Sequence, residues 1–507
     1  MPITLTNAIL FHLDPIKIES GGIRIEGPTI VAAGPTVQSQ PGDTVIDCEG
    51  AIVLPGLVNG HTHLYSALAT GMPMPEKQPK NFHEILKFIW WRLDRALDAE
   101  SIEMSARVGA LDALACGTTT LIDHHASPNC IEGSLDLIEK GIRDIGLRAV
   151  LCYETTDRNG LTGFEAGLAE NRRYLDKCKT RTDGRFGALV GAHAAFTLSD
   201  VSLRACVDLA EQFETGIHIH VAEDPCDDAI CRAEYGAPLL DRLRNCGFIA
   251  SDLVAASNEP SAVESTAGVA PANSRCHPDA ATPANTLISR SILGHGTHLA
   301  PADAASLSSL AAGIAHNPRS NMNNVVGYAP IPHMSRVLLG TDGIGGDMIT
   351  EAKTAWFKYR DSQYKRSVEP EDAKRAGSVS ARSAAEKTAT NAENATGVTP
   401  GRILDMLAQN ARVASAILNR TLGKLEPGAA ADIVITNYIP TTPLNAGNAS
   451  AHFIFGMGAH NTHDVLIGGE MKFTSHGARR MPREIRGMAA ISTAELWKRM
   501  QDIGYDD

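Results

Sequence analysis

Two histidines separated by a single residue, His61 and His63, follow the short apolar run Ala51–Val58. The run is short for a helix and has the apolar composition of a buried strand. Side chains at positions i and i+2 of a strand point to the same face of the sheet. The two imidazoles are therefore predicted to project together from the end of a strand, as half of a divalent metal site.

Polar residues that end other apolar segments are candidates for the remaining ligands. His220 ends one such segment, and Asp342, in Gly-Thr-Asp-Gly, ends another. Three imidazoles and one carboxylate suit Zn²⁺, with Fe²⁺ or Mn²⁺ as alternatives, and a catalytic site keeps one position open for water. We expect one divalent cation per chain, held by His61, His63, His220 and Asp342.

Hydrolysis at such a centre also needs groups that move protons. Glu223 lies three residues after His220, near the same rim, and is predicted to be the general acid. His295 ends a further apolar segment and is expected to orient the water or polarise the substrate. Asp342 is expected to accept the proton of the water. Glu154 ends yet another segment, where it is either a substrate contact or a salt-bridge partner.

Eight apolar segments that end in His, Asp or Glu would position these groups. After the segment that ends at His63, they are residues 118–125, 147–154, 186–193, 216–223, 291–295, 313–316 and 337–342. Helical patterns separate most of them, in residues 99–116, 131–145, 203–213, 238–246 and 302–311. This alternation predicts an α/β fold, a TIM-like (β/α)₈ barrel whose active site lies at the carboxyl ends of the strands.

The two ends of the chain carry short β patterns punctuated by glycine and proline. We expect residues 1–55 and 421–475 to form a small β-sandwich domain together, because residues 1–55 alone are few for a core. The barrel would span residues 56–420, with low-complexity insertions at about 255–286 and 368–399. Residues 476–507 would form a C-terminal extension.

Other histidines near the predicted strand ends have structural interpretations. His218 is expected to face the helices as a core histidine, and His298 to cap or pack after the sixth strand. His316 is expected to shape the turn that follows it. Neighbouring residues of a strand point to opposite faces, so only one of His124 and His125 is expected at the rim.

Bulk properties exclude several classes of partner. The net charge is −12 without a Lys/Arg cluster, which argues against a nucleic-acid partner. No apolar run approaches the roughly 18 residues that a membrane span needs, and no secretory signal is recognisable. The ten cysteines are scattered, so we expect free thiols and a cytoplasmic location. A homodimer is expected only because dimers are the commonest soluble oligomers.

Several motifs occur in the order known from one family. They are Pro-Gly-Leu-Val-Asn-Gly-His61-Thr-His63, His220-Val-Ala-Glu223, Gly-His295-Gly-Thr-His-Leu, His316-Asn-Pro-Arg-Ser-Asn and Leu-Gly-Thr-Asp342-Gly. The chain thereby resembles the amidohydrolase superfamily, in its cyclic-deaminase and chlorohydrolase branch. Asp123-His124-His125-Ala-Ser-Pro-Asn and Cys152-Tyr-Glu154-Thr-Thr-Asp-Arg158 most resemble the SsnA-type aminohydrolases.

The resemblance implies roles for individual residues. His61, His63, His220 and Asp342 would bind one metal ion, usually zinc, and Glu223, His295 and Asp342 would form the catalytic trio. His193 would be a substrate-side histidine. Dinuclear members carry a lysine at the end of the fourth strand, where this chain has Val-Gly-Ala-His193, so a single metal ion is implied.

The predicted activity is hydrolysis of a non-peptide carbon–nitrogen bond in a small molecule. Deamination of an amino-substituted, purine-like heterocycle is the leading interpretation, because protonation of a ring nitrogen needs an acid such as Glu223. Hydrolysis of a C–Cl bond, a urea or a cyclic amide is the alternative, and a non-catalytic scaffold is a remote one. We expect His193, Glu154 and His125 to contact the substrate. Further loop candidates are His83, Trp90, Trp91, Arg92 and Arg158, and for the two tryptophans helix and core roles are at least as reasonable.

Overall fold

The computed structural model describes residues 1–249, 286–367, 397–475 and 482–505. The two predicted insertions lie almost entirely outside these residues. Within them, two parallel sheets carry the predicted strands. One has the order β6 (Leu57–Thr62), β7 (Thr118–His125), β8 (Arg148–Tyr153) and β9 (Phe186–Ala188). The other has the order β10 (Val190–Ala194), β11 (Ile217–Val221), β12 (Ile292–His295), β13 (Gly313–His316) and β14 (Val337–Leu339).

The two sheets are connected at both edges. A parallel bridge between Thr62 and Asp342 connects the first strand to the last. At the other edge, Thr155 bridges to Ala192, and the predicted fourth strand is interrupted at Leu189 into β9 and β10. The strands therefore follow one another in a ring, which is the barrel that the sequence predicts, with an additional domain beside it.

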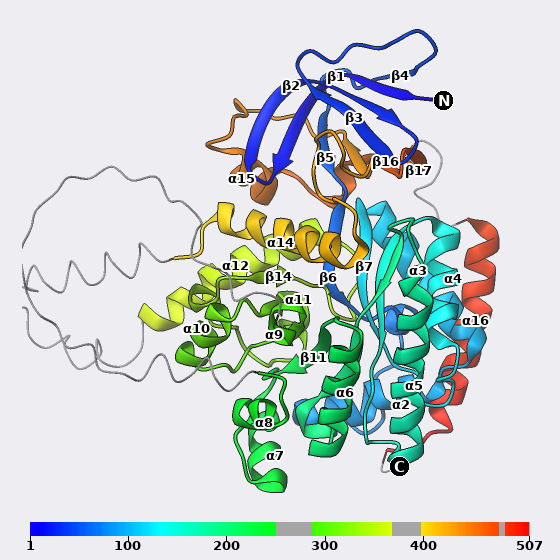
Figure 1. Ribbon diagram of the computed structural model, residues 1–507, viewed down its shortest axis with the longest axis vertical. Helices are drawn as coiled ribbons and strands as arrows, with labels where there is room; N and C mark the ends of the chain where they lie inside the picture. Colours follow the sequence, from blue (N-terminus) through cyan, green and yellow to red (C-terminus); the bar gives the residue numbers. More distant parts are fainter. Residues whose placement is uncertain (250–285, 368–396, 476–481, 506–507) are drawn as a thin grey trace, which may run out of the picture.

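Helices surround this ring (Figure 1). They include α3 (Ala99–Ala115), α4 (Ser134–Ile145), α5 (Gly160–Lys179), α6 (Asp200–Gln212), α8 (Leu239–Asn245), α10 (Pro301–Ser309) and α14 (Pro400–Leu418). The predicted ranges agree with these bounds to within a few residues. Side-chain caps explain several of the starts: Asp98 accepts from the backbone N–H of Ser101 at α3, and Ser199 accepts from that of Ser202 at α6.

The additional domain is built from both ends of the chain. Its eight strands are β1 (Ile3–Leu13), β2 (Ile16–Glu26), β3 (Thr29–Gly34), β4 (Thr44–Asp47), β5 (Ile52–Pro55), β15 (Ile433–Thr436), β16 (Thr462–Ile467) and β17 (Glu470–Thr474). They form one hydrogen-bonded sheet in which β5 of the N-terminal segment pairs with β15 of the C-terminal segment. Two segments far apart in the sequence are therefore neighbours in this sheet. Leu10, Ile23, Ile433 and Leu466 share its buried core. The two-layer sandwich stays a prediction.

A buried ion pair connects the C-terminal segment to the barrel. Arg148, on β8, donates from Nε and Nη2 to the two carboxylate oxygens of Asp432 at 2.7 and 3.0 Å. Both side chains are almost fully buried. The carboxylate also accepts from the backbone N–H of Gly468 at 2.8 Å, so the pair fixes the turn between β16 and β17 against the barrel.

The C-terminal helix α16 (Arg483–Gln501) lies along α3 and α2 (Trp91–Ala96). Arg92 donates to the carbonyl oxygens of Met500 and Ile503, so this predicted substrate candidate instead holds the C-terminal extension. Across the described ranges, no helix is long and apolar enough to cross a membrane.

Candidate metal centre and active site

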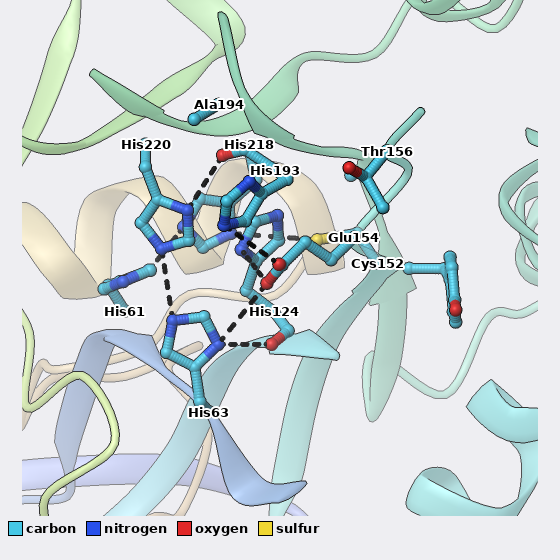
Figure 2. A network of polar contacts seen from close by, with 12 residues as sticks. His61, His63, His124, Cys152, Glu154, Thr156, His193, Ala194, His218 and His220 are labelled. Carbon is cyan, nitrogen blue, oxygen red and sulfur yellow. Dashed lines mark hydrogen bonds and ion pairs between the residues drawn. The ribbon is translucent and has the colours of Figure 1, made fainter. Parts of the chain in front are cut away.

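The structure brings the four predicted metal ligands together at the carboxyl ends of the strands. His61 belongs to β6, His63 follows it, His220 belongs to β11, and Asp342 follows β14. The Oδ1 atom of Asp342 lies 3.0 Å from Nε2 of His63 and 3.6 Å from Nε2 of His61. The Nε2 atoms of His63 and His220 are 3.1 Å apart. Figure 2 shows the three imidazoles converging on one point.

The hydrogen bonds of these rings fit a divalent cation. The Nδ1 atoms of His63 and His220 each face a backbone carbonyl, that of His124 at 2.6 Å and that of His193 at 2.8 Å. A carbonyl only accepts, so both Nδ1 atoms carry a proton, and in the neutral rings both Nε2 atoms present lone pairs. Two lone pairs 3.1 Å apart repel unless a cation or a proton lies between them. Although burial acts to lower it, Asp342 raises the pKa of His63 to about 9, so this position attracts positive charge. The buried Nε2 of His61 also has no hydrogen-bond partner, as a metal ligand requires.

A fifth group is close enough to take part. The ring of His295 offers a nitrogen that lies, with ligand atoms of His61, His220 and Asp342, in a set whose members are all within 4.8 Å of one another. Its Nδ1 faces Oδ1 of Asn321 at 2.8 Å, so Nε2 is directed toward the centre. His295 therefore either touches the cation or holds a water beside it, which are the two roles that its position allows.

Burial and neighbouring charges set the electrostatics of the centre. Burial lowers the pKa of His61 to about 4, so this ring is neutral near pH 7. Burial alone would raise the pKa of Asp342, but His61 and His63 outweigh it and hold the pKa well below its usual value. The carboxylate is therefore ionised, as a ligand and a proton acceptor must be.

The pKa of Glu223 is shifted in the opposite direction to that of Asp342. It lies just after β11, its Oε2 is 3.4 Å from Nε2 of His295, and the side chain is buried. Burial raises the pKa of Glu223 well above its usual value, and the nearby carboxylates of Asp342 and Asp227 raise it further. A carboxyl group with a raised pKa next to one with a lowered pKa is the arrangement expected of a general acid beside a base.

A cavity opens from this centre and has an aromatic wall. Tyr65, Phe82, Trp90, Trp91 and Phe196 line it, together with His193, Glu154, Glu223 and His295. The predicted substrate contacts His193 and Glu154 thus reach the cavity, and Nε2 of His193 lies 3.4 Å from Oε1 of Glu154. Burial raises the pKa of Glu154 to about 7, although His63 and Arg158 act to lower it.

Some histidines lie elsewhere than the sequence predicts. His125 is not among the residues that line the cavity, since its Nε2 lies 3.0 Å from Oγ of Ser127. The expectation that His218 faces the helices is wrong: its ring lies inside the barrel, with Nε2 2.7 Å from Nδ1 of His61. Residues i and i+2 of a strand share a face, so His218 and His220 point the same way. His124 also points inward and stacks on His218, with ring centroids 4.6 Å apart.

Sequence reasoning assigned no role to the short helix α11 (Pro318–Asn323). Its Ser320 donates to Oδ2 of Asp342 at 2.5 Å, and its Asn321 faces His295. One short helix therefore contacts two of the predicted catalytic residues. The motif His316-Asn-Pro-Arg-Ser-Asn was visible in the sequence, but nothing in its spacing shows which strand end its side chains reach.

Comparison with known proteins identifies the family. The model of the amidohydrolase family matches residues 52–472, so the chain belongs to this family, which confirms the predicted resemblance and the class of hydrolases acting on non-peptide carbon–nitrogen bonds. The chain is 27% identical over 473 residues to a 5-methylthioadenosine/S-adenosylhomocysteine deaminase of Desulforudis audaxviator, covering 89% of each chain.

Two solved structures share the fold. An adenosine deaminase from Xanthomonas campestris with bound zinc matches with a TM-score of 0.73 at 20% identity, covering 99% of each chain. The atrazine chlorohydrolase of Arthrobacter aurescens TC1 complexed with zinc matches with a TM-score of 0.71 at 19% identity, covering 97% of this chain and all of the other. At this level of identity the likeness is one of fold.

Proposed function

We propose that this protein hydrolytically deaminates an amino-substituted nitrogen heterocycle of the purine type, with one divalent cation bound by His61, His63, His220 and Asp342. The observation that carries the proposal is the position of Glu223 and Asp342 on either side of His295, whose Nε2 lies 3.4 Å from Oε2 of Glu223 and 3.8 Å from Oδ2 of Asp342. The surroundings raise the pKa of Glu223 and lower that of Asp342, which agrees with this division of roles. The name of the relative from Desulforudis audaxviator supports the same chemistry. Strand β10 reads Val-Gly-Ala-His193-Ala and carries no lysine, which supports a site for a single cation.

The residues divide the proton transfers between them. When bound, a divalent cation, with zinc as the first candidate and Fe²⁺ or Mn²⁺ as alternatives, supplies a Lewis acid that lowers the pKa of water toward about 7. Asp342 accepts a proton from the attacking water, and Glu223 donates its proton to a ring nitrogen. The water oxygen bonds to the ring carbon, and the proton held by Asp342 passes to the exocyclic amine. The bond from the ring carbon to that amine breaks, ammonia leaves, and the remaining hydroxyl proton returns to Glu223 as the ring carbonyl forms. His295 orients the water between the two carboxyl groups.

The cavity favours a flat, aromatic substrate. Phe82, Trp90, Trp91 and Phe196 offer ring faces and edges against which a heterocycle can stack. Glu154 and His193 line the same cavity and supply polar contacts near the metal ligands. A hydrolase of C–Cl bonds remains the second candidate, because the barrel of the atrazine chlorohydrolase matches this one along almost its whole length.

The test combines a metal count with ammonia release. We expect about one zinc or iron per chain by elemental analysis, and ammonia from at least one member of a panel containing adenosine, 5-methylthioadenosine, S-adenosylhomocysteine and guanine. Glu223→Gln should lose at least about 100-fold in kcat/KM with its metal retained. The matched control is Glu165→Gln, an exposed carboxyl on α5, which should retain full activity.

Two outcomes would refute the proposal. Chloride release from a chlorotriazine without any ammonia release from the purines would move the C–Cl hydrolase ahead. Metal-free protein under metal-replete conditions would remove the catalytic interpretation and leave a scaffold protein.

A further inference from the structure

The three histidine ligands differ in what holds their Nδ1 atoms. His63 and His220 each face a backbone carbonyl, which accepts a hydrogen bond whatever the neighbouring side chains do. His61 faces a side chain instead, because its Nδ1 lies 2.7 Å from Nε2 of His218. An imidazole nitrogen can either donate or accept, so this contact alone leaves the proton position of His61 open.

The neighbours of His218 determine which nitrogen of His61 carries the proton. For His61 to offer the Nε2 lone pair to a cation, its Nδ1 must carry the proton and donate to Nε2 of His218. The other nitrogen of His218, Nδ1, must then carry a proton, and it lies 3.8 Å from Sγ of Cys152. Sγ of Cys152 in turn lies 3.5 Å from the carbonyl oxygen of Asp123, which can only accept. From His61 through His218 and Cys152 to the carbonyl of Asp123, each group therefore donates to the next group farther from the cation site.

We infer that His218 and Cys152 are positioning residues that fix the protonation and the orientation of the metal ligand His61. The inference rests on the cation centre of the proposed function. All three side chains are almost fully buried, so no water replaces a missing partner. The ring of His124, stacked on His218 at an interplanar angle of 27°, restrains the plane of His218. Figure 2 draws these residues in one network around the ligands.

This arrangement has a consequence for metal binding. A buried Nδ1–H of His61 without an acceptor would favour the other tautomer, in which Nε2 carries the proton and cannot bind a cation. Loss of the partner of a metal-bound histidine typically weakens metal binding 10- to 100-fold. The effect should appear in the affinity for the cation itself, before any substrate is added.

The experiment measures the dissociation constant of Zn²⁺ by competition with a chromophoric chelator, using the full-length protein. His218→Leu should bind Zn²⁺ about 10- to 100-fold more weakly than the wild type. His218→Gln, whose Oε1 can accept the hydrogen bond of His61, should recover most of that affinity. The control is His316→Leu, a buried histidine on β13 without a hydrogen bond to a ligand, which should bind as the wild type does.

Folded His218→Leu protein that binds Zn²⁺ like the wild type would overturn the inference, and so would His218→Gln binding as weakly as His218→Leu. If His218→Leu does not fold, the Cys152 variants decide. Cys152→Ser can still donate and accept and should bind Zn²⁺ normally, whereas Cys152→Ala should bind it more weakly; equal affinities would overturn the inference. Wild-type protein that binds no cation would instead refute the proposed function, on which this inference depends.

Discussion

Ser320→Ala isolates the support that helix α11 gives to the catalytic carboxylate. The hydroxyl of Ser320 donates to Oδ2 of Asp342 at 2.5 Å in a buried environment. A hydrogen bond to a charged group contributes about 1.5–3 kcal/mol. If the contact acts on the proton acceptor in the transition state, its loss should lower kcat by about 10- to 150-fold, at about 1.4 kcal/mol for each factor of ten. KM should change little, because the contact is with Asp342 and not with the substrate.

The assay is steady-state ammonia release, with the metal content of each preparation measured in parallel. Ser320→Thr keeps a hydroxyl and should retain most of the activity, so it separates the hydrogen bond from the mere presence of the side chain. The reasoning is refuted if Ser320→Ala keeps kcat within about twofold of the wild type at full metal content. A drop in kcat matched by a loss of metal would mean that Ser320 acts on the cation site instead.

Two further predictions concern stability. Burial raises the pKa of Asp94 to about 6, above its unfolded value of about 3.9, so the folded state binds the extra proton and stability falls as pH rises from about 4 to about 6. Asp94→Asn should remove about 2 kcal/mol of this dependence between pH 4.5 and 7, measured by urea unfolding; an unchanged pH dependence would contradict it. Asp432→Asn breaks the buried pair with Arg148 and should lower the free energy of unfolding by about 3–5 kcal/mol. Arg148→Met and Asp432→Leu together should lower it less than either of these two substitutions does alone. Additive unfolding free energies would contradict this second prediction.

The sequence predicted that the proposed ligands lie together because each stands at the end of an apolar run. In a closed parallel barrel the carboxyl ends of all strands meet at one rim, so the type of residue at each end is enough to bring His61, His220 and Asp342 together. The same logic predicted Glu223 and His295, which the structure places 3.4 Å apart. No distance information was needed beyond the order of the strands.

The remaining parts of the site depend on facts that strand order does not contain. His218 was misassigned because its position two residues before His220 was read as alternation, although a spacing of two keeps a side chain on the same face. Ser320 and the aromatic residues Trp90 and Trp91 come from segments outside the strands, whose direction is set by tertiary packing. Helical and turn patterns alone give no orientation relative to the barrel axis.

The closure of the barrel explains why the centre can exist before a cation arrives. The backbone N–H groups of Thr341 and Asp342 both donate to the carbonyl of His61, at 2.9 and 3.0 Å, and that of His63 faces the carbonyl of Asp342 at 3.3 Å. The proposed ligands from the first and the last strand are thus hydrogen-bonded to each other through their main chains. Asp342 has a positive φ of 53°, a conformation that non-glycine residues adopt rarely and at a cost. The hydrogen bonds of this seam hold the residue there, and its carboxylate faces His61 and His63 for that reason. The proposed metal centre is therefore a product of barrel closure, which places two distant parts of the sequence at one point.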